Sequence, residues 1–225
     1  MKIMILGSPG SGKGTYALRL SDIFKIPHIS SGDILRAARE DPKIGKTVKE
    51  YQDKGLPVPD EIAMPLIEER LEKEDCRNGF ILDGLTYNIN QAKLLDKITS
   101  LDLVVNLLLP DDVVVKKNLG RITCKNCGAT YNVAEIKEGD IYMPPLPPKK
   151  NGICDRCGGQ LGTRSDDTEK TIRERLRVYW ERINPVIKFY KDKGLIRDVK
   201  VNSSPDIMVP KILEVIKKEL GVKNV

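Results

Sequence analysis

Short, nearly continuous apolar runs alternate along the chain with longer stretches whose apolar positions recur at helical spacing. Such runs are typical of strands buried on both faces of a parallel sheet. The predicted strands are Lys2–Leu6, His28–Ser30, Phe80–Asp83, Leu103–Leu109 and Ile196–Val201, and the predicted helices include Asp60–Lys73, Asn90–Lys97, Asp111–Leu119 and Glu169–Lys193. The alternation predicts an α/β protein, a three-layer α/β/α fold around a five-stranded parallel sheet that binds ligands at the carboxyl ends of its strands.

Proline and glycine refine this pattern near the carboxyl end. Asn184-Pro185 predicts a kink or a break in the long helix. The run Ser203–Asp206 predicts the start of a last helix that reaches Leu220, and Gly221 is placed to end it. Two stretches interrupt the core pattern: 31–59 is helical and polar, and 121–167 is richer in glycine, proline and cysteine. Each predicts an insert in the core.

A glycine-rich loop, GSPGSGKGT, follows the first predicted strand. Glycines let successive backbone N–H groups point toward a polyphosphate, and the following helix offers its positive end to the same anion. Lys13 adds a mobile positive charge. A strand, a glycine-rich turn with a lysine and an amphipathic segment, in that order, predict a loop that binds a nucleoside triphosphate. Its residues are Gly10, Ser11, Gly12, Lys13, Gly14 and Thr15.

Four of the five cysteines form two CxxC pairs, Cys124 with Cys127 and Cys154 with Cys157. Two such turns supply four thiolates for a tetrahedral zinc ion, and a filled set leaves no open position for catalysis. We therefore expect a structural Zn²⁺. The stretch between the pairs exceeds the usual spacing of about 15–20 residues. It carries the apolar, proline-rich segment 141–148, which either packs on its own insert or forms an exposed contact with another subunit.

Composition narrows the class of protein. Hydrophobic residues make up 40% and charged residues 31% of the 225 positions, as in a soluble globular protein. The net charge of +6 suits an anionic ligand, but only 5% of residues are aromatic, which argues against a nucleic-acid platform. No apolar stretch reaches membrane-spanning length, and Met1 leads directly into a strand. We expect a cytoplasmic protein that binds neither nucleic acid nor membrane.

The loop departs from the general phosphate-binding pattern, because Gly14 stands where Ser or Thr usually ligates magnesium. The form G-x-P-G-x-G-K-G-T resembles the nucleoside monophosphate kinases, and the adenylate kinase family above all. The resemblance spans nearly the whole chain. It recurs, in order and spacing, at SSGDILR, CRNGFILDG, LGR, TRSDD and RERL.

The resemblance implies a reversible, Mg²⁺-dependent phosphoryl transfer from ATP to AMP that gives two ADP. It also implies a division of the chain into a core of residues 1–30, 60–120 and 168–225, an AMP-binding insert at 31–59 and a zinc-binding lid at 121–167. We expect a monomer by default, with a possible contact between copies through segment 141–148.

The resemblance assigns site residues as well. The implied catalytic residues are Lys13, Asp83, Arg121, Arg164 and Arg175. Besides the loop, the implied ATP-binding residues are Lys117, Arg121 and Lys200. The implied AMP-binding residues are Ser31, Arg36, Val58, Gly84, Tyr87, Gln91, Arg164 and Arg175. Bidentate guanidinium groups suit phosphate oxygens, and phosphoryl transfer chiefly requires alignment and positive charge.

Three carboxylates and the single histidine admit more than one role. Asp83 ends an apolar strand, and we assign it to magnesium through water, with capping of the next turn as the alternative. Asp166 and Asp167 either orient the lid arginines or cap the helix that begins at Glu169. His28, on the second predicted strand, is interpreted as structural.

Two positions depart from the family pattern. Tyr87 stands where an arginine normally grips the monophosphate, so we expect a high Michaelis constant for AMP or a replacement cation. Lys117 replaces the arginine that usually stacks on adenine, and lysine lacks a planar face. Gln91 remains where adenylate kinases read the AMP base.

Other functions stay open at this stage. A kinase of the same fold with another donor such as GTP differs from an adenylate kinase only in specificity. A zinc-ribbon nucleic-acid module driven by a P-loop ATPase predicts a separate ribbon domain, whereas these cysteines lie inside the lid position. A catalytically weak nucleotide sensor is made conceivable by Tyr87.

Overall fold

Five parallel strands form the central sheet of the protein, for which a computed structural model describes residues 1–53, 58–163 and 167–222. The strand order is β10-β4-β1-β3-β2. Their bounds are β1 Lys2–Gly7, β2 His28–Ser30, β3 Phe80–Asp83, β4 Leu103–Leu108 and β10 Ile196–Lys200. The prediction of a five-stranded parallel sheet in an α/β fold is confirmed, because β1 pairs in parallel with both β3 and β4.

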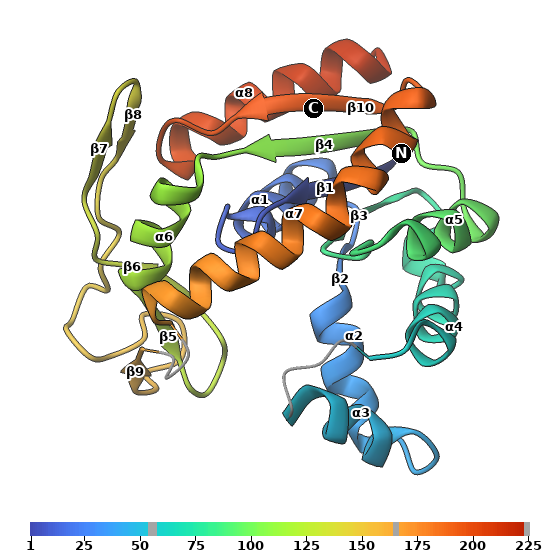
Figure 1. The fold of residues 1–225 in the computed structure, drawn as a ribbon, viewed down its shortest axis with the longest axis horizontal. Helices are drawn as coiled ribbons and strands as arrows, with labels where there is room; N and C mark the ends of the chain where they lie inside the picture. The colour runs from blue at the N-terminus through green and yellow to red at the C-terminus, as the bar shows by residue number, and fades with distance from the viewer. Residues whose placement is uncertain (54–57, 164–166, 223–225) are drawn as a thin grey trace.

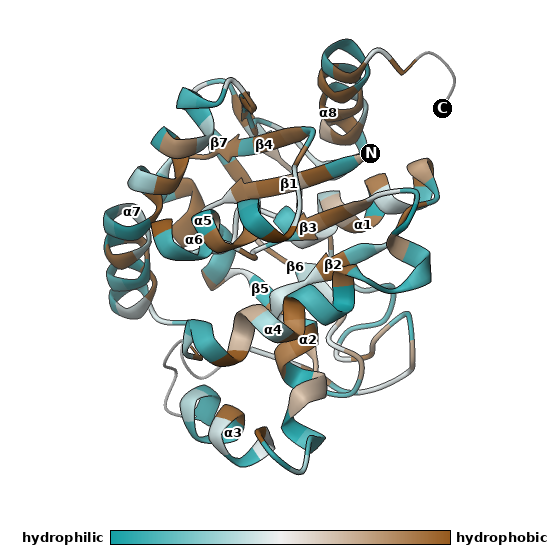
Figure 2. Ribbon diagram, turned by 90° about the vertical axis from the view of Figure 1, so that its right-hand side faces the viewer, coloured by the Kyte–Doolittle hydropathy of each residue, from teal (hydrophilic) through white to brown (hydrophobic). Residues whose placement is uncertain are grey.

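Side chains of β1 alternate between two hydrophobic cores. Ile3 and Ile5 pack with helices α1 and α8 on one face of the sheet, whereas Met4 and Leu6 pack with α4, α5 and α7 on the other. Figure 2 shows the strands as the most apolar elements between these helices. This burial on both faces explains why the strands read as continuous apolar runs.

The helices of the core match the periodic segments of the sequence. They are α1 Lys13–Phe24, α4 Asp60–Leu71, α5 Ile89–Ile98, α6 Asp111–Leu119, α7 Glu169–Asp192 and α8 Pro205–Leu220 (Figure 1). Gly221 ends α8 with a φ of 66°, as predicted. Helix α7, in contrast, continues unbroken through Pro185. Ile183 and Val186 on either side of the proline are buried in the core, and this packing holds the helix together.

The first insert is helical, as predicted. It contains α2 Ser31–Ala37, a 3-10 turn at Ala38–Glu40 and α3 Gly45–Asp53. Ala38, Val48 and Val58 form a small core of their own, separate from the cores of the sheet. The turn-rich residues 54–57, which the sequence placed at the end of this insert, lie outside the described residues.

The second insert contains two separate β structures. A three-stranded antiparallel sheet is formed by β5 Arg121–Cys124, β6 Thr130–Asn132 and β9 Leu161–Gly162, and we call it the zinc-binding sheet. This sheet and the α2–α3 insert project from the same side of the molecule (Figure 1). Strands β7 Ile136–Glu138 and β8 Ile141–Met143 form a two-stranded hairpin beside it.

The hairpin packs against the core of the protein, and we call residues 136–143 the docked hairpin. Ile136, Ile141 and Met143 are buried in the same hydrophobic core as α1, α6 and α8. The Tyr142 N–H donates to the carbonyl of Asn202, with 3.0 Å between nitrogen and oxygen. Ile141 and Met143 of segment 141–148 therefore face the core of the protein, whereas Leu146 pairs with Asn132 of the zinc-binding sheet through two backbone hydrogen bonds.

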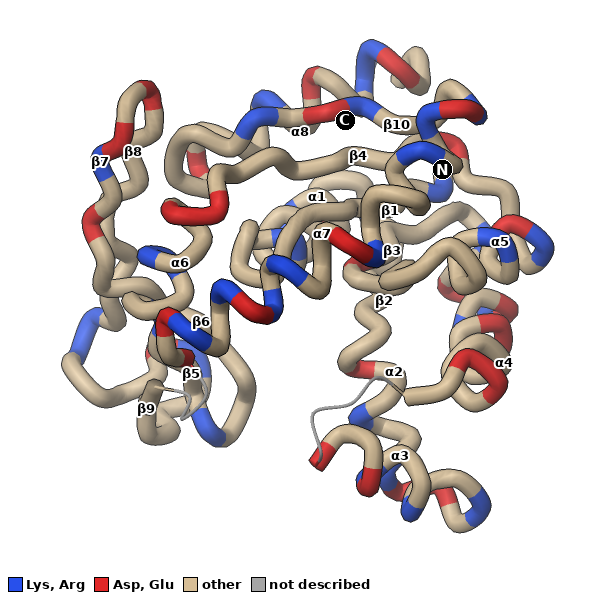
Figure 3. The backbone as a smooth tube through the Cα atoms, in the orientation of Figure 1, with Lys and Arg blue, Asp and Glu red and all other residues tan. Residues whose placement is uncertain are grey.

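Charged residues are mixed over the surface rather than gathered by sign. Figure 3 shows basic and acidic residues alternating along α7, where Arg177 pairs with both Glu174 and Glu181. This mixture favours a solvated surface as the source of most of the net positive charge. Within the described residues, no helix is both long and apolar enough to cross a membrane.

Candidate active site

The glycine-rich loop connects β1 to α1, at the carboxyl edge of the central strand. Gly10 and Gly12 have φ values of 88° and 102°, which favour glycine strongly. Helix α1 begins at Lys13, directly after the left-handed Gly12. The loop thus places the positive end of α1 and its backbone N–H groups at the sheet edge where the sequence predicted a triphosphate.

Lys13 and Asp83 meet at this edge from two different strands. The Lys13 ammonium donates to the carbonyls of Gly7 at 2.8 Å and Ser8 at 3.1 Å. Burial lowers the pKa of Lys13, and the negative charge of Asp83 opposes that shift. Asp83 ends β3, next to β1. A methyl group at Gly14 would lie 3.1 Å from the Asp83 carboxylate, so glycine leaves room between that carboxylate and the helix.

His28 lies beside the same carboxylate, which the sequence analysis missed. Its Nε2 is 3.5 Å from Oδ2 of Asp83. The contact arises from register, because β2 pairs with β3 and places His28 opposite Ile81 and Ser30 opposite Asp83. With this register, the period-2 alternation places the side chains of His28 and Asp83 on the same face of the sheet.

Helix α6 supports the loop from the other side. The Lys117 ammonium donates to the carbonyl of Ser11 at 3.4 Å, and burial lowers the pKa of Lys117 to about 8. Asn118 is buried and donates to the carbonyls of Val114 at 2.8 Å and Pro9 at 3.4 Å. A methyl group at Gly10 would collide with the Asn118 amide. Asn118 therefore fixes the loop, although no sequence pattern singles it out.

Arg121 and Asp167 form a bidentate ion pair where the chain enters and leaves the second insert. The Nη2 of Arg121 lies 2.6 and 2.9 Å from the two carboxylate oxygens, and the Asp167 side chain is only 4% exposed. Thr168, rather than an aspartate, caps α7 by accepting from the Thr171 N–H. Asp167 thus orients an arginine, which was one of its two predicted roles. Asp166 and Arg164 lie outside the described residues.

Arg175, predicted as catalytic and AMP-binding, and the remaining residues predicted for ATP are more scattered. Arg175 lies on an exposed position of α7, and Thr15 is exposed on the first turn of α1. Lys200 ends β10, and its ammonium pairs with Asp140 of the docked hairpin at 3.0 Å. The contacts described for Lys200 thus tie it to the hairpin and not to the phosphate-binding loop.

Residues predicted for the AMP phosphate gather where α2 follows β2. The Ser31 hydroxyl donates to the carbonyl of Gly84, which has a φ of 64°. The hydroxyl of Tyr87 comes close to the same glycine, because a methyl group at Gly84 would lie 2.7 Å from it. Arg36, one turn along α2, pairs with Asp33, and both side chains are largely exposed.

Gln91, predicted to read the AMP base, and Val58, predicted to bind AMP, lie near the starts of α5 and α4. Gln91 is buried, its amide donates to Asp60 at 2.6 Å, and its carbonyl accepts from the Tyr87 N–H at 2.7 Å. Val58 is buried in the small core of the α2–α3 insert. The structure thus brings Gln91 and Tyr87 together, and Ser31 joins them through Gly84.

The four cysteines converge at the end of the zinc-binding sheet. Their sulfur atoms all lie within 4.8 Å of one another, and the closest pairs are 3.5 and 3.6 Å apart. Tetrahedral thiolates around zinc are separated by about 3.8 Å. The turns that carry the two CxxC pairs have a similar backbone conformation, because the glycine after each pair, Gly128 and Gly158, has a φ of 71° and 69°. The cluster Cys124, Cys127, Cys154 and Cys157 therefore fits a structural zinc.

The site combines three features: a phosphate-binding loop, a carboxylate on the adjacent strand, and an arginine at the base of a separate small sheet. Together they define the class of P-loop phosphotransferases that act on nucleoside monophosphates. The adenylate kinase family model matches residues 5–195 of the chain. The chain belongs to the adenylate kinase family, whose members transfer a phosphoryl group from ATP to AMP with Mg²⁺ on the nucleotide.

Relatives cover nearly the whole chain. An adenylate kinase of Caldicellulosiruptor bescii is 48% identical over 202 residues, 87% of this chain and 89% of the relative. That of Archaeoglobus fulgidus is 45% identical over 205 residues, covering 88% and 90%. That of Thermodesulfovibrio yellowstonii is 44% identical over 225 residues, covering 97% and 100%.

Proposed function

We propose that ATP binds on the loop from Gly10 to Thr15 and that AMP binds between α2, α5 and the turn after β3. Lys117 and Lys200 are the further proposed ATP residues, on α6 and at the end of β10. For the monophosphate we propose Ser31, Gly84, Tyr87 and Arg36, and for its base Val58 and Gln91. Strong support comes from the placement of Lys13 and Asp83 together at the edge of the sheet.

In the proposed transfer, an oxygen of the AMP phosphate bonds to the γ-phosphorus of ATP while the bond to the β–γ bridging oxygen breaks. Two ADP molecules result. Lys13 exchanges its bonds to the Gly7 and Ser8 carbonyls for bonds to phosphate oxygens, and it follows the migrating charge. Arg121, Arg164 and Arg175 stabilise the equatorial oxygens of the transferred group.

Asp83 is the residue that we assign to the magnesium of the nucleotide. Glycine at position 14 keeps a side chain away from the helix side of this carboxylate, because a Cβ there would lie 3.1 Å from Asp83 Oδ2. Magnesium keeps several of its waters, so Asp83 is proposed to hold it through water. When bound, the ion neutralises charge on the β- and γ-phosphates.

The proposed domains are a core of residues 1–30, 60–120 and 168–225, an AMP-binding insert at 31–59 and a lid at 121–167. Closure of the lid excludes water from the reacting phosphates. Within the lid we assign the motion to the zinc-binding sheet, since the docked hairpin is buried against the core. The Arg121–Asp167 pair marks the base of that sheet.

A coupled assay of ADP formation from each pair of nucleoside triphosphate and monophosphate tests this function. We expect the highest kcat/KM with ATP and AMP. A faster reaction with GTP than with ATP would mean that GTP is the phosphoryl donor. ATP hydrolysis that is stimulated by nucleic acid and transfers no phosphoryl group to AMP would overturn the proposed function.

We propose a monomeric, cytoplasmic enzyme with no nucleic-acid partner. The burial of Ile141 and Met143 removes two apolar side chains from the surface of segment 141–148, on which Tyr142 and Leu146 remain exposed. Sedimentation at micromolar concentration tests the oligomeric state. If the parent enzyme is a dimer and Leu146→Asp makes it a monomer, the two copies associate through segment 141–148, and the proposal of a monomer is wrong.

A further inference from the structure

Tyr131 connects the two cysteine turns of the zinc-binding sheet. It lies on β6, which follows the first cysteine pair in the sequence, yet its hydroxyl contacts the second pair. The hydroxyl donates to Sγ of Cys154, with 3.5 Å between oxygen and sulfur, and accepts from the Asp155 N–H at 2.7 Å. Its half-buried ring packs in the same small cluster as Cys124 and Leu161. One side chain thus bonds both a cysteine of the metal cluster and the backbone beside it.

The chemistry of the three groups fixes the direction of these bonds. A hydroxyl has one proton to donate, and a backbone N–H can only donate. Because the Asp155 N–H donates to the Tyr131 oxygen, the phenol proton remains available for the Cys154 sulfur. A thiolate that binds a metal has no proton and therefore accepts. Hydrogen bonds to a charged acceptor are roughly twice as strong as those between neutral groups.

Four thiolates benefit from such donors. Together they carry more negative charge than one Zn²⁺ neutralises. Hydrogen bonds to the ligand atoms draw off part of that charge and fix the orientation of the ligands. Cys154 is only 2% exposed, so water reaches its sulfur poorly and a donor from the protein has a correspondingly larger effect.

We propose that Tyr131 is a positioning residue of the metal centre, whose hydroxyl stabilises the Cys154 thiolate on the zinc ion and holds the second CxxC turn, 154–157, beside the first. The zinc-binding sheet buries few apolar side chains, so its folding depends on how tightly the metal is held. The proposal concerns the structural metal alone and does not depend on which nucleotides the enzyme uses.

The second turn has further anchors that do not involve Tyr131. The Cys154 N–H donates to the carbonyl of Gly159 at 2.9 Å, and the Asp155 carboxylate accepts from the Lys149 N–H at 3.0 Å. Phenylalanine at position 131 keeps the ring in the cluster and removes only the hydroxyl. Tyr131→Phe is therefore expected to leave the turn folded and to remove the bond to sulfur.

The zinc affinity of Tyr131→Phe, measured by competition with a chromophoric chelator, tests the proposal. We expect an affinity about 10- to 100-fold lower than that of the parent enzyme, as is usual when a hydrogen bond to a metal ligand is lost. Tyr142→Phe is the matched control, because Tyr142 is 48% exposed and lies on the docked hairpin. The control is expected to keep the parent affinity, and a parent affinity in Tyr131→Phe as well would overturn the proposal.

The Co²⁺-substituted protein separates the bond to sulfur from a purely structural effect. A hydrogen bond stabilises the electrons of a thiolate, so its loss is expected to move the sulfur-to-cobalt charge-transfer band of Tyr131→Phe to longer wavelength than in the parent enzyme and in Tyr142→Phe. A weaker affinity with an unmoved band would mean that Tyr131 acts only through the Asp155 backbone. A variant that binds no metal at all would mean that the sheet cannot form without the hydroxyl. Either result overturns the proposal.

Discussion

At the scale of single residues, Lys13 is held by the loop that it serves. Its ammonium bonds two loop carbonyls, and burial lowers its pKa while the charge of Asp83 raises it. The side chain is therefore already placed near the phosphates, and the entropy of ordering it is lost on folding rather than in each catalytic cycle.

Lys13→Ala is expected to lower kcat about 10²- to 10³-fold, as loss of one preorganised donor to a transition state does. The fold is expected to survive, because the helix start depends on the glycines of the loop. Steady-state kinetics and a thermal melt measure the two effects. Lys93→Ala, at an exposed position of α5, is the control. Turnover near that of the parent enzyme would exclude the loop assignment.

The lowered pKa of Lys117 predicts that ATP binding is accompanied by proton uptake. Burial lowers its pKa to about 8, so near pH 8 a fraction of the molecules lacks the charge. A polyphosphate nearby favours the ammonium and raises that pKa, so ATP binding takes up protons. Titration calorimetry near pH 8, in buffers of different ionisation enthalpy, measures the uptake.

Lys117→Arg is the matched comparison, because arginine stays protonated at this pH. We expect a smaller proton uptake than in the parent enzyme, and any remainder belongs to other groups such as Lys13. Equal uptake in both proteins would place Lys117 away from the nucleotide.

Sequence reasoning identified residues that act through a local motif and missed those that act through packing. Lys13 and Asp83 could be predicted because a loop and a strand end place them. Asn118 was missed because its contact with the loop depends on how α6 packs, and His28 because its contact with Asp83 depends on strand register. The role of Asp167 was narrowed to two options that only its geometry separated.

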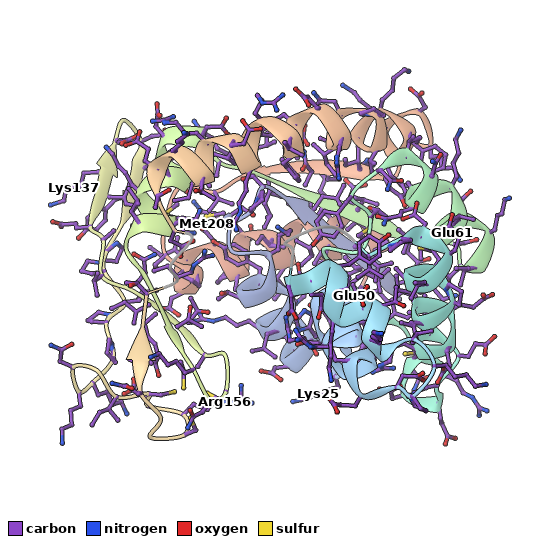
Figure 4. All side chains as sticks on the ribbon, turned by 60° about the horizontal axis from the view of Figure 1, so that its bottom comes forward. Lys25, Glu50, Glu61, Lys137, Arg156 and Met208 are labelled. Carbon is purple, nitrogen blue, oxygen red and sulfur yellow. The ribbon has the colours of Figure 1, made fainter. Side chains whose placement is uncertain are left out.

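At the scale of elements, the zinc-binding sheet has almost no hydrophobic core of its own. Cys124, Cys154 and Leu161 are its buried hydrophobic residues. A metal bound by four thiolates supplies the folding free energy that such a small sheet lacks. Its tip, labelled by Arg156 in Figure 4, lies well away from Lys137 of the docked hairpin.

Metal analysis is expected to give about one zinc per chain. Cys154→Ser is expected to lose that zinc and to unfold the zinc-binding sheet at a lower temperature than the core, seen by calorimetry. Cys76→Ser serves as the control, since Cys76 is buried in the core beside Arg70 and should leave the zinc content unchanged. A melting curve unaffected by both chelation and Cys154→Ser would contradict a structural metal.

How well an element could be predicted depends on its length and on whether the segment it packs against is near it in the sequence. The five core strands were predicted to within a residue or so, and burial on both faces makes the three inner strands β1, β3 and β4 nearly continuous apolar runs. The strands of the docked hairpin have only three residues each, and the segment that they join, around Asn202, is far away in sequence. Of the kink or break expected at Pro185, the break did not occur, because tertiary packing outweighed one lost hydrogen bond.

At the scale of the whole molecule, the two inserts project from the same side of the sheet, with the phosphate-binding loop at its edge (Figure 1). A dinucleotide that bridges the ATP and AMP sites is expected to bind about 10²- to 10⁴-fold more tightly than ATP, because the second half binds at high effective concentration. Competition binding against a fluorescent nucleotide measures both affinities.

Arg36→Ala is expected to bring the affinity for the dinucleotide toward that for ATP, since it removes one of the positive charges proposed to bind the acceptor phosphate. Equal affinity of the parent enzyme for the dinucleotide and for ATP would mean that the molecule does not hold two nucleotides together.

The docked hairpin divides one long excursion of the chain into two short ones. Without it, the backbone would leave the core at Gly120 and return near Thr168, and the ends of a loop lose more entropy on closure the longer the loop is. Anchoring at Ile136, Ile141 and Met143 fixes the middle of that path. When the zinc is removed, each half remains tethered near its native place, so the cysteines stay at high local concentration and recapture of the metal is favoured.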